Sequence, residues 1–335
     1  MARKGKWEMA RRKVRKAVNF TGSQHPSITS MSQPIVVFGS INLDLVARSP
    51  RLPVPGETIL GHSFARVPGG KGANQAVAAA RLGVPTVMVG RVGGDAFGQE
   101  LLTSLQRSQV QCEGVQVDAS THSGVAVIAV ADGGENHIIV IPGANGRVDR
   151  TDVERLKPFL KGAASLLLQF EIPLPVVQMA ATAARAAGVR VILDPAPAVA
   201  NLPADLYTLV DILTPNSVEA SQLVGFAVDA PDAVNHAAQV LLQRGVKQVV
   251  IKLGAEGAFY ATESETFWVP AFPVEAIDTV AAGDAFNAGL AVALAEGRSL
   301  HEALTWGSAA GALAVTKAGA QSSLPDRSAL EACLG

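Results

Sequence analysis

The segment from Asp278 to Asn287 places a carboxylate among small residues where a helix is expected to begin. Asp284 follows Ala282 and Gly283, so these residues fall in the first helical turn. The N–H groups and dipole of a helix N-terminus stabilise developing negative charge. A carboxylate beside them can take a proton from a hydroxyl as its oxygen attacks phosphorus. An Asp in a first turn also caps a helix without any chemistry, so the segment alone leaves both interpretations open.

A glycine-rich segment, Pro68 to Asn74, precedes an Ala-rich stretch. Clustered glycines allow the backbone to approach a ligand closely, and a helix start supplies unpaired N–H donors. The segment is not a phosphate-binding P-loop, because Ala65 stands five residues before Gly70 and a glycine follows Lys71. No GxGxxG follows the first apolar run, which argues against a dinucleotide-binding dehydrogenase. A plain tight turn accounts equally well for these glycines.

Asn42 and Asp44 follow the first apolar run and are two residues apart. In an extended chain they lie on one side, where a carboxylate and an amide suit vicinal hydroxyl groups. Asn and Asp are also ordinary turn residues after a strand. Taken alone, the pair favours the turn interpretation.

The elements that must position these residues alternate short β-branched runs with Ala-rich stretches, which is typical of an α/β domain with a mostly parallel sheet. We expect buried strands at 35–39, 86–90, 165–169, 189–193, 212–214 and 248–252. We expect helices at 71–82, 96–108, 149–160, 175–187, 217–224, 233–244, 283–296 and 300–317.

One region breaks this alternation. The run 124–131, the turn Asp132–Glu135 and the run 137–141 predict a hairpin. Together with strand-like stretches at 43–48 and 57–65, the hairpin can form a small second sheet that serves as a lid. Edge strands of the main sheet are the alternative, which we disfavour because the runs enter as pairs without crossover helices.

Composition excludes several classes of protein. The 335 residues are 48% hydrophobic and 17% charged, with a mean hydropathy of +0.27, so the chain can bury a large core. Only Cys112 and Cys333 occur, and the six histidines have no metal-ligand spacing, which argues against a disulfide framework or zinc site and favours the cytoplasm. No apolar run reaches the ~18 residues of a membrane span, and no GxSxG hydrolase motif occurs.

The first 31 residues carry a net charge of +7, which leaves −8 on the rest of the chain. An Arg-rich, acid-poor N-terminus can be a targeting segment. We favour a basic, disordered extension over residues 1–33, because the segment lacks an amphipathic stripe. The acidic remainder argues against a nucleic-acid function.

Taken together, the motifs resemble the ribokinase branch of the phosphofructokinase-B sugar kinases, collinearly from about Ile35 to the C-terminus. The resemblance is carried by Asn42 and Asp44, the 69–74 signature Gly-Gly-Lys-Gly-Ala-Asn, the segment Thr214-Pro-Asn-Ser-Val-Glu219 and the signature Asp278-Thr-Val-Ala-Ala-Gly-Asp284. It implies a layered α/β/α domain over 34–335 with a β-sheet lid near 41–66 and 110–142. The implied activity is transfer of the ATP γ-phosphate to the 5-hydroxyl of D-ribose.

The resemblance also implies roles for individual residues. Asp284 would be the catalytic base, with the N–H groups of Ala282, Gly283 and Asp284 around the transferred phosphoryl group. Sugar binding is implied for Asn42, Asp44, Gly70, Lys71, Gly72, Ala73, Asn74, Glu171 and Asp284. ATP binding is implied for Asn216, Lys252, Leu253, Gly254, Ala255, Glu256, Gly257, Gly283, Asp284 and Ser308.

Two metal ions and a partner complete what the resemblance implies. Glu219 would organise Mg²⁺ through its water shell. A potassium site would be formed by Asp278, Val280, Ala314, Lys317, Gly319 and Ser323. Pairing of the lids would give a homodimer, with no nucleic-acid or membrane partner. Two alternatives stay open: a kinase of the same family acting on 2-deoxyribose, fructose or a nucleoside, and a non-catalytic sensor of sugar and nucleotide.

Overall fold

The computed structural model describes residues 33–335, which form a nine-stranded sheet and a separate four-stranded sheet. The expected basic extension therefore lies almost entirely outside the described residues. The order in the large sheet is β13-β12-β11-β10-β9-β8-β1-β4-β5. Its strands are β1 (Ile35–Phe38), β4 (Thr86–Gly93), β5 (Gln111–Asp118), β8 (Ser165–Leu168), β9 (Arg190–Leu193), β10 (Ile212–Leu213), β11 (Gln248–Lys252), β12 (Ala258–Ala261) and β13 (Thr266–Val269).

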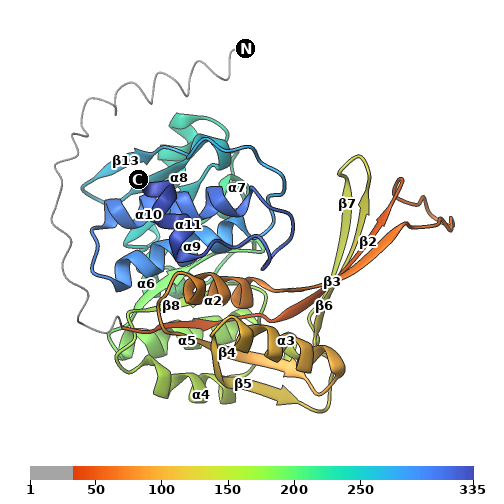
Figure 1. Ribbon diagram of the computed structural model, residues 1–335. Helices are drawn as coiled ribbons and strands as arrows, with labels where there is room; N and C mark the ends of the chain where they lie inside the picture. The colour runs from red at the N-terminus through yellow and green to blue at the C-terminus, as the bar shows by residue number, and fades with distance from the viewer. Residues whose placement is uncertain (1–32) are drawn as a thin grey trace.

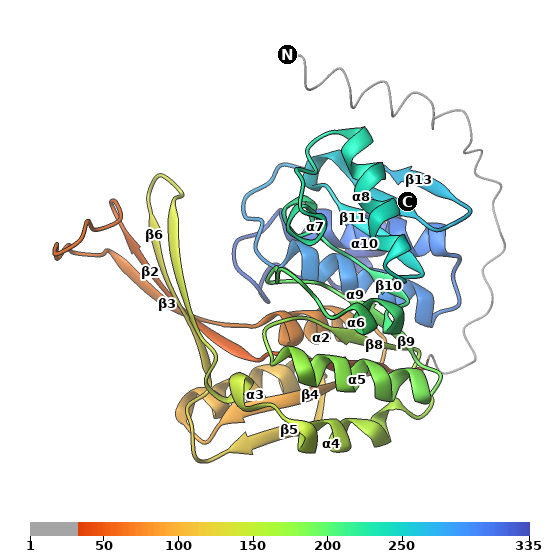
Figure 2. The same ribbon diagram turned by 180° about the vertical axis from the view of Figure 1, so that it is seen from behind.

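Helices cover both faces of the large sheet (Figures 1 and 2). One face packs on α2 (Lys71–Arg81), α3 (Ala96–Arg107), α9 (Ala282–Ala295), α10 (Leu300–Ala314) and α11 (Arg327–Leu334). The other packs on α4 (Arg150–Leu160), α5 (Leu174–Ala186), α6 (Ala204–Leu209), α7 (Ser217–Val224) and α8 (Pro231–Gln243). Strands between two helical layers are apolar on both sides, and all four residues of β1 are fully buried.

The expected α/β/α layering is confirmed, and the six expected buried strands are all present within a residue or two at each end, except that β4 extends to Gly93. The strands from β11 through β1 to β5 are parallel. Strands β12 and β13 add an antiparallel edge. Neither these two strands nor the helices α6 and α11 were predicted from the sequence. The last long helix ends at Ala314, before the expected 317. The Val315 carbonyl there accepts hydrogen bonds from the N–H groups of Ile277 and Asp278, so the chain turns to meet the start of α9.

The smaller sheet projects from one end of the molecule as a long ribbon, orange to yellow in Figure 1. Its order is β3-β2-β6-β7, formed by β2 (Asn42–Ser49), β3 (Ser63–Gly69), β6 (Gly124–Ala131) and β7 (Asn136–Ile141). The predicted hairpin is β6 with β7, and β2 pairs antiparallel with β3. The central pair of β2 and β6 is parallel, and its crossover runs through β3, α2, β4, α3 and β5.

Two boundaries of the predicted lid are wrong. The stretch 110–142 was expected in the lid, but β5 pairs in parallel with β4 at the edge of the large sheet. Alternating polar residues in β5 are those of an edge strand exposed on one side, which is why it resembles a lid strand in sequence. The strand expected at 57–65 is β3, shifted to Ser63–Gly69 by its register with β2. Within residues 33–335, no helix is long and apolar enough to cross a membrane.

Candidate active site

The candidate site lies along the carboxyl ends of the parallel strands, where ligands bind in open α/β sheets. Each of five neighbouring strands is followed there by a polar residue of the site: Ser40 after β1, Glu171 after β8, Asp194 after β9, Asn216 after β10 and Lys252 at the end of β11. Helices α2 and α9 begin at the same edge and pack against each other. The sheet thereby gathers segments that are far apart in sequence.

The N-terminus of α9 has the features of an anion site. Ala281 precedes the helix with φ of 59°, a left-handed conformation that costs a non-glycine residue about 1 kcal/mol. The first N–H groups of a helix have no intrahelical acceptor. The Ala282 N–H lies 3.4 Å from the Thr279 carbonyl, which leaves those of Gly283 and Asp284 for a ligand. The Lys252 Nζ lies 3.2 Å from where a Cβ on Gly283 would be. This end of the helix therefore combines N–H donors with an ammonium group, as a phosphoryl group requires.

Asp284 lies in the first turn of α9 and is 5% exposed. Its Oδ2 accepts a hydrogen bond from Asn74 Nδ2 at 3.0 Å, and its Oδ1 accepts one from Gln75 Nε2 at 3.1 Å. Burial raises the pKa of Asp284 to about 6, although the Lys71 ammonium group lowers this pKa, and the Asp194 carboxylate raises it further. A carboxylate with a pKa near 6 is ionised at neutral pH and is still basic enough to accept a proton.

Asn42 and Asp44 lie in β2 at the base of the lid, beside the glycine-rich turn. The Asn42 Oδ1 accepts a hydrogen bond of 2.7 Å from Asn145 Nδ2. Gly70 has φ of 87°, and a Cβ there would lie 2.7 Å from the Asn42 nitrogen, so this turn requires glycine. Burial and then the nearby Glu171 carboxylate raise the pKa of Asp44 to about 7. The structure therefore brings together the residues expected around the sugar.

Glu171 connects this cluster to the start of α2. Its Oε2 accepts hydrogen bonds from Ser40 Oγ at 2.5 Å and from the backbone N–H of Lys71 at 3.0 Å. Burial lowers the pKa of Lys71, but the carboxylates of Asp284, Asp194, Glu171 and Glu219 raise it more, so that the net shift is upward. Lys71 is therefore a fixed positive charge among acidic groups.

The residues expected around the nucleotide lie at the ends of β10 and β11. Asn216 caps α7 in a capping box, because its Oδ1 accepts from the Glu219 N–H while the Glu219 side chain accepts from the Asn216 N–H. Burial raises the pKa of Glu219, and Lys252 partly opposes this shift. The turn from β11 to β12 consists of Leu253, Gly254, Ala255, Glu256 and Gly257, and its residues 254–256 form a 3-10 helix.

Ser308 lies in α10 and donates a hydrogen bond of 3.2 Å to the Pro270 carbonyl. Ser308 is 8% exposed. Its hydroxyl therefore joins α10 to the segment after β13. A role beside the nucleotide base remains a prediction for this residue.

The six residues expected to bind potassium fall on two adjacent loops. Asp278 accepts hydrogen bonds from the Val280 N–H at 3.0 Å and from the Gly319 N–H at 2.9 Å. The Ser323 hydroxyl, which is buried, donates to the Ala320 carbonyl at 2.8 Å. Ala314 is the last residue of α10, and Lys317 lies in the second loop, which follows this helix. Loops with carbonyl, carboxylate and hydroxyl oxygens can bind a hard cation.

Several residues of the site carry no motif of their own. Gln75 contacts Asp284 and Gln169, and Asn145 contacts Asn42. Their signal in the sequence is a polar residue at a position whose neighbours are apolar and buried, as for Gln169 at the end of Ser-Leu-Leu-Leu-Gln. Buried polar side chains need partners, but the sequence does not say which.

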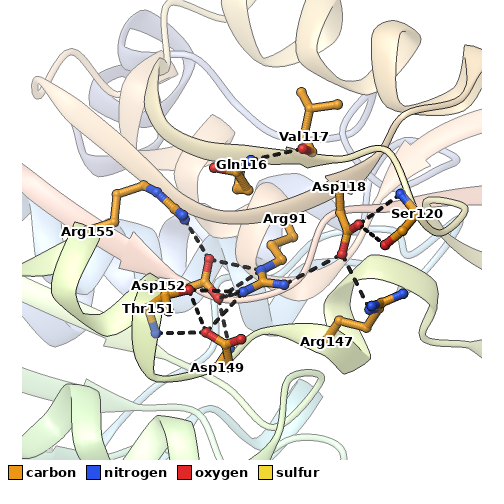
Figure 3. A network of polar contacts seen from close by, with 10 residues as sticks. All are labelled: Arg91, Gln116, Val117, Asp118, Ser120, Arg147, Asp149, Thr151, Asp152 and Arg155. Carbon is orange, nitrogen blue, oxygen red and sulfur yellow. Dashed lines mark hydrogen bonds and ion pairs between the residues drawn. The ribbon is translucent and has the colours of Figure 1, made fainter.

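A network of ion pairs supports the short 3-10 helix that carries Asn145 (Figure 3). Arg91 of β4 contacts Asp152 at 2.7 Å, Asp149 at 3.0 Å and Asp118 at 3.6 Å. Arg147, two residues after Asn145, contacts Asp118 at 3.4 Å. Hydrogen bonds to Asp152, followed by its charge and that of Asp149, raise the pKa of Arg91 although burial lowers it. The network ties the start of α4 to β4, β5 and this 3-10 helix.

Comparisons with known proteins agree with this geometry. Residues 32–327 match the model of the pfkB family carbohydrate kinases. The chain is 40% identical to the ribokinase of Haemophilus influenzae, over 89% of this chain and 97% of that protein. It is 41% identical to the ribokinase of Schizosaccharomyces pombe, over 87% of this chain and 94% of that protein. The structure of Arabidopsis thaliana ribokinase with ribose and ATP is similar, with a TM-score of 0.84, 36% identity, and coverage of 91% of this chain and 99% of that one.

Proposed function

The chain belongs to the pfkB family of carbohydrate kinases, and we propose that it phosphorylates D-ribose at the 5-hydroxyl with ATP. It is a phosphotransferase. The observation that carries the proposed reaction is the position of Asp284, a buried carboxylate with a raised pKa in the first turn of α9. A base and an anion site on one helix turn are what transfer of a phosphoryl group to a hydroxyl requires.

In the proposed reaction the sugar oxygen attacks the γ-phosphorus of ATP as Asp284 takes the hydroxyl proton. The new bond joins that oxygen to phosphorus, and the bond between phosphorus and the ADP oxygen breaks. The N–H groups of Ala282, Gly283 and Asp284 stabilise the charge on the transferred group. The proton remains on the Asp284 carboxyl until the sugar phosphate leaves.

The sugar would lie between β2 and the start of α2. Asp44 and Glu171 would accept hydrogen bonds from its hydroxyl groups, and Lys71 and Asn74 would donate to its oxygens. Asn42 uses its carbonyl oxygen for Asn145, so its N–H donors serve the ligand. Gly70, Gly72 and Ala73 would border the sugar through their backbone.

ATP would bind along the ends of β10 and β11, with Asn216, Lys252 and the turn 253–257 at its border and Ser308 near the base. Residues 33–335 contain no cluster of three metal-ligating side chains. Glu219 is a single carboxylate on the nucleotide side, which fits Mg²⁺ because this ion is usually held by one or two carboxylates together with phosphates and water. When bound, the ion would neutralise charge on the phosphates, and Glu219 would orient its water.

A potassium ion would bind between the loop at Asp278 and the loop at Gly319 to Ser323. Asp278 already holds both loops through hydrogen bonds to Val280 and Gly319. The first of these loops leads directly into α9. An ion there would therefore stabilise the turn at Ala281 that exposes the anion site.

The lids of two copies of the chain would pair and thereby form a homodimer. All six residues of β7 are exposed, with Ile138, Ile139 and Val140 at 54%, 64% and 50%. Contiguous exposed apolar residues mark interaction surfaces. Lids paired in this way would also keep water, a competing phosphoryl acceptor, away from the sugar.

The test is an ADP-release assay on the purified protein with MgATP and, in turn, ribose, 2-deoxyribose, fructose and adenosine. Each acceptor is assayed with potassium and with sodium. We expect ribose to be turned over preferentially and potassium to raise the rate. Preference for another acceptor would overturn the sugar assignment but keep the kinase, and binding of ribose without turnover of any acceptor would favour the sensor.

A further inference from the structure

We propose that Gln75, held in place by Gln169, is a positioning residue that orients the Asp284 carboxylate for proton abstraction. The inference rests on the proposed role of Asp284 as catalytic base. It goes beyond that role because neither glutamine is placed to act on phosphorus or to bind the nucleotide.

The contacts of Gln75 can be satisfied in only one orientation of its amide. Its Nε2 lies 3.1 Å from Asp284 Oδ1 and 3.3 Å from Asp194 Oδ2. Ionised carboxylates only accept hydrogen bonds, so the side of Gln75 that faces them must be the NH₂ group. The Gln75 Oε1 consequently faces Gln169, which donates to it from Nε2 at 2.7 Å.

Gln169 is the group that prevents the Gln75 amide from rotating. With its own NH₂ turned to Gln75, the Gln169 Oε1 has no hydrogen-bond partner within the described part of the chain. Burying an acceptor without a partner costs free energy, so its presence here calls for a compensating benefit. We infer that the benefit is the fixed orientation of Gln75.

The backbone beside β1 is shaped to accept the Gln169 amide. A Cβ on Gly39 would lie 2.0 Å from Gln169 Oε1. No other residue type can occupy position 39 without displacing this amide. The space at Gly39, the amide of Gln169 and the amide of Gln75 therefore form a continuous support behind Asp284.

The charges around Asp284 explain why its orientation needs support. Lys71 of α2 attracts the carboxylate, while Asp194 after β9 repels it, and Lys252 of β11 neutralises part of Asp194 through a contact of 2.8 Å. The Gln75 NH₂ group bonds to both carboxylates. Without it the two carboxylates would face each other directly, and protonation of Asp284 would become easier.

The test measures kcat/KM for the sugar against pH, with saturating MgATP, for Gln75→Met, Gln169→Met and their double variant. Methionine keeps the length of glutamine and removes the amide. Loss of a hydrogen bond to a charged group should move the acidic limb of the profile to higher pH by about one unit in Gln75→Met. Gln169→Met should move it in the same direction by less, and the double variant should match Gln75→Met.

Gln248 provides the matched control. It starts β11, at the opposite end of the strand from Lys252, and its Oε1 is also buried without a partner among the described residues. Gln248→Met should therefore keep the wild-type profile. If Gln169→Met does not fold by thermal denaturation, Gln169→Asn tests the same contact, because its amide is one methylene too short to reach Gln75.

The inference is overturned if the glutamine variants keep the wild-type acidic limb, or if their effects in the double variant are additive. Failure of the proposed function gives a different result. Asp284→Asn would then retain turnover in the same assay, whatever the glutamine variants do. An inactive Asp284→Asn with unshifted glutamine variants would reject the positioning role alone.

Discussion

Replacing Asp284 by Asn separates its chemical role from its structural cost. The change removes the base and keeps the size of the side chain. General bases contribute about 10²- to 10⁴-fold to the rates of reactions of this kind. We expect kcat to fall by at least 10²-fold, while the dissociation constant of the sugar changes by less than about tenfold because the other sugar-binding residues remain.

The same substitution removes a buried charge that destabilises the fold at neutral pH. The pKa of Asp284 rises from 3.8 to about 6 on folding. A carboxyl with a raised folded-state pKa favours the folded state at acidic pH, and this contribution is lost as the pH rises through 6. The difference corresponds to at most about 3 kcal/mol. Asn opposes this gain, because its NH₂ group must face one of the donors on Asn74 and Gln75.

Thermal denaturation between pH 4 and pH 8 measures the destabilisation caused by the Asp284 charge. The hydrogen bond lost in the Asn variant does not depend on pH, so its size need not be known. The Tm of Asp284→Asn relative to wild type should increase from pH 4 to about pH 6.5 and then remain constant. Calorimetric titration with the sugar at pH 7.5 and the ADP-release assay complete the comparison. A Tm difference that is flat or falls with pH, or a kcat within tenfold of wild type, would refute the reasoning.

Three further predictions concern Asp44, Asn145 and Asp278. Asp44→Asn should raise the Tm more at pH 8 than at pH 5, because the pKa of Asp44 rises from 3.8 to about 7 on folding and its destabilising effect grows across that range. The variant should also weaken sugar binding. An equal change in Tm at both pH values would contradict this. Asn145→Ala removes three hydrogen bonds to Ile41 and Asn42. The KM for the sugar should therefore rise at least about tenfold, while the KM for ATP stays unchanged. Equal rises in both constants would reject a local effect on Asn42. Asp278→Ala should reduce the rate in potassium to the rate in sodium, with thermal denaturation as the check on folding; full activation by potassium in this variant would place the cation elsewhere.

The sequence predicted the architecture of the large sheet because its signal is local. Each buried strand is a short apolar run, and many of the helices are Ala-rich. Five helices, α3, α4, α7, α10 and α11, begin at a residue whose side chain caps them. These preferences act within a few residues. Strands at the edge of the sheet were harder to predict from the sequence. The polar alternation of β5 is compatible with either sheet. Its pairing with β4 depends on register with residues 24 or 25 positions earlier in the chain.

In the lid, too, the strands could be predicted from the sequence but their pairing could not. Its strands were predicted from alternation and the turn at Asp132–Glu135, but the parallel pairing of β2 with β6 brings Asn42 opposite Gly124. That pairing places Asn145 against Asn42. No pattern in either segment indicates the other, because five elements lie between β2 and β6 in the chain.

By itself the sequence determined the α/β class, the motifs around the sugar and phosphates, and Asp284 as the candidate base. Only the tertiary structure decided what surrounds that base. Asn74 and Asp284 are 210 positions apart, and Gln75 and Gln169 are 94 apart. Burial and neighbouring charges raise the pKa of Asp284, and Gln75 and Gln169 hold its carboxylate. These effects depend on distances between strands and helices that the fold alone sets, since desolvation and electrostatic interaction act through space and not along the chain.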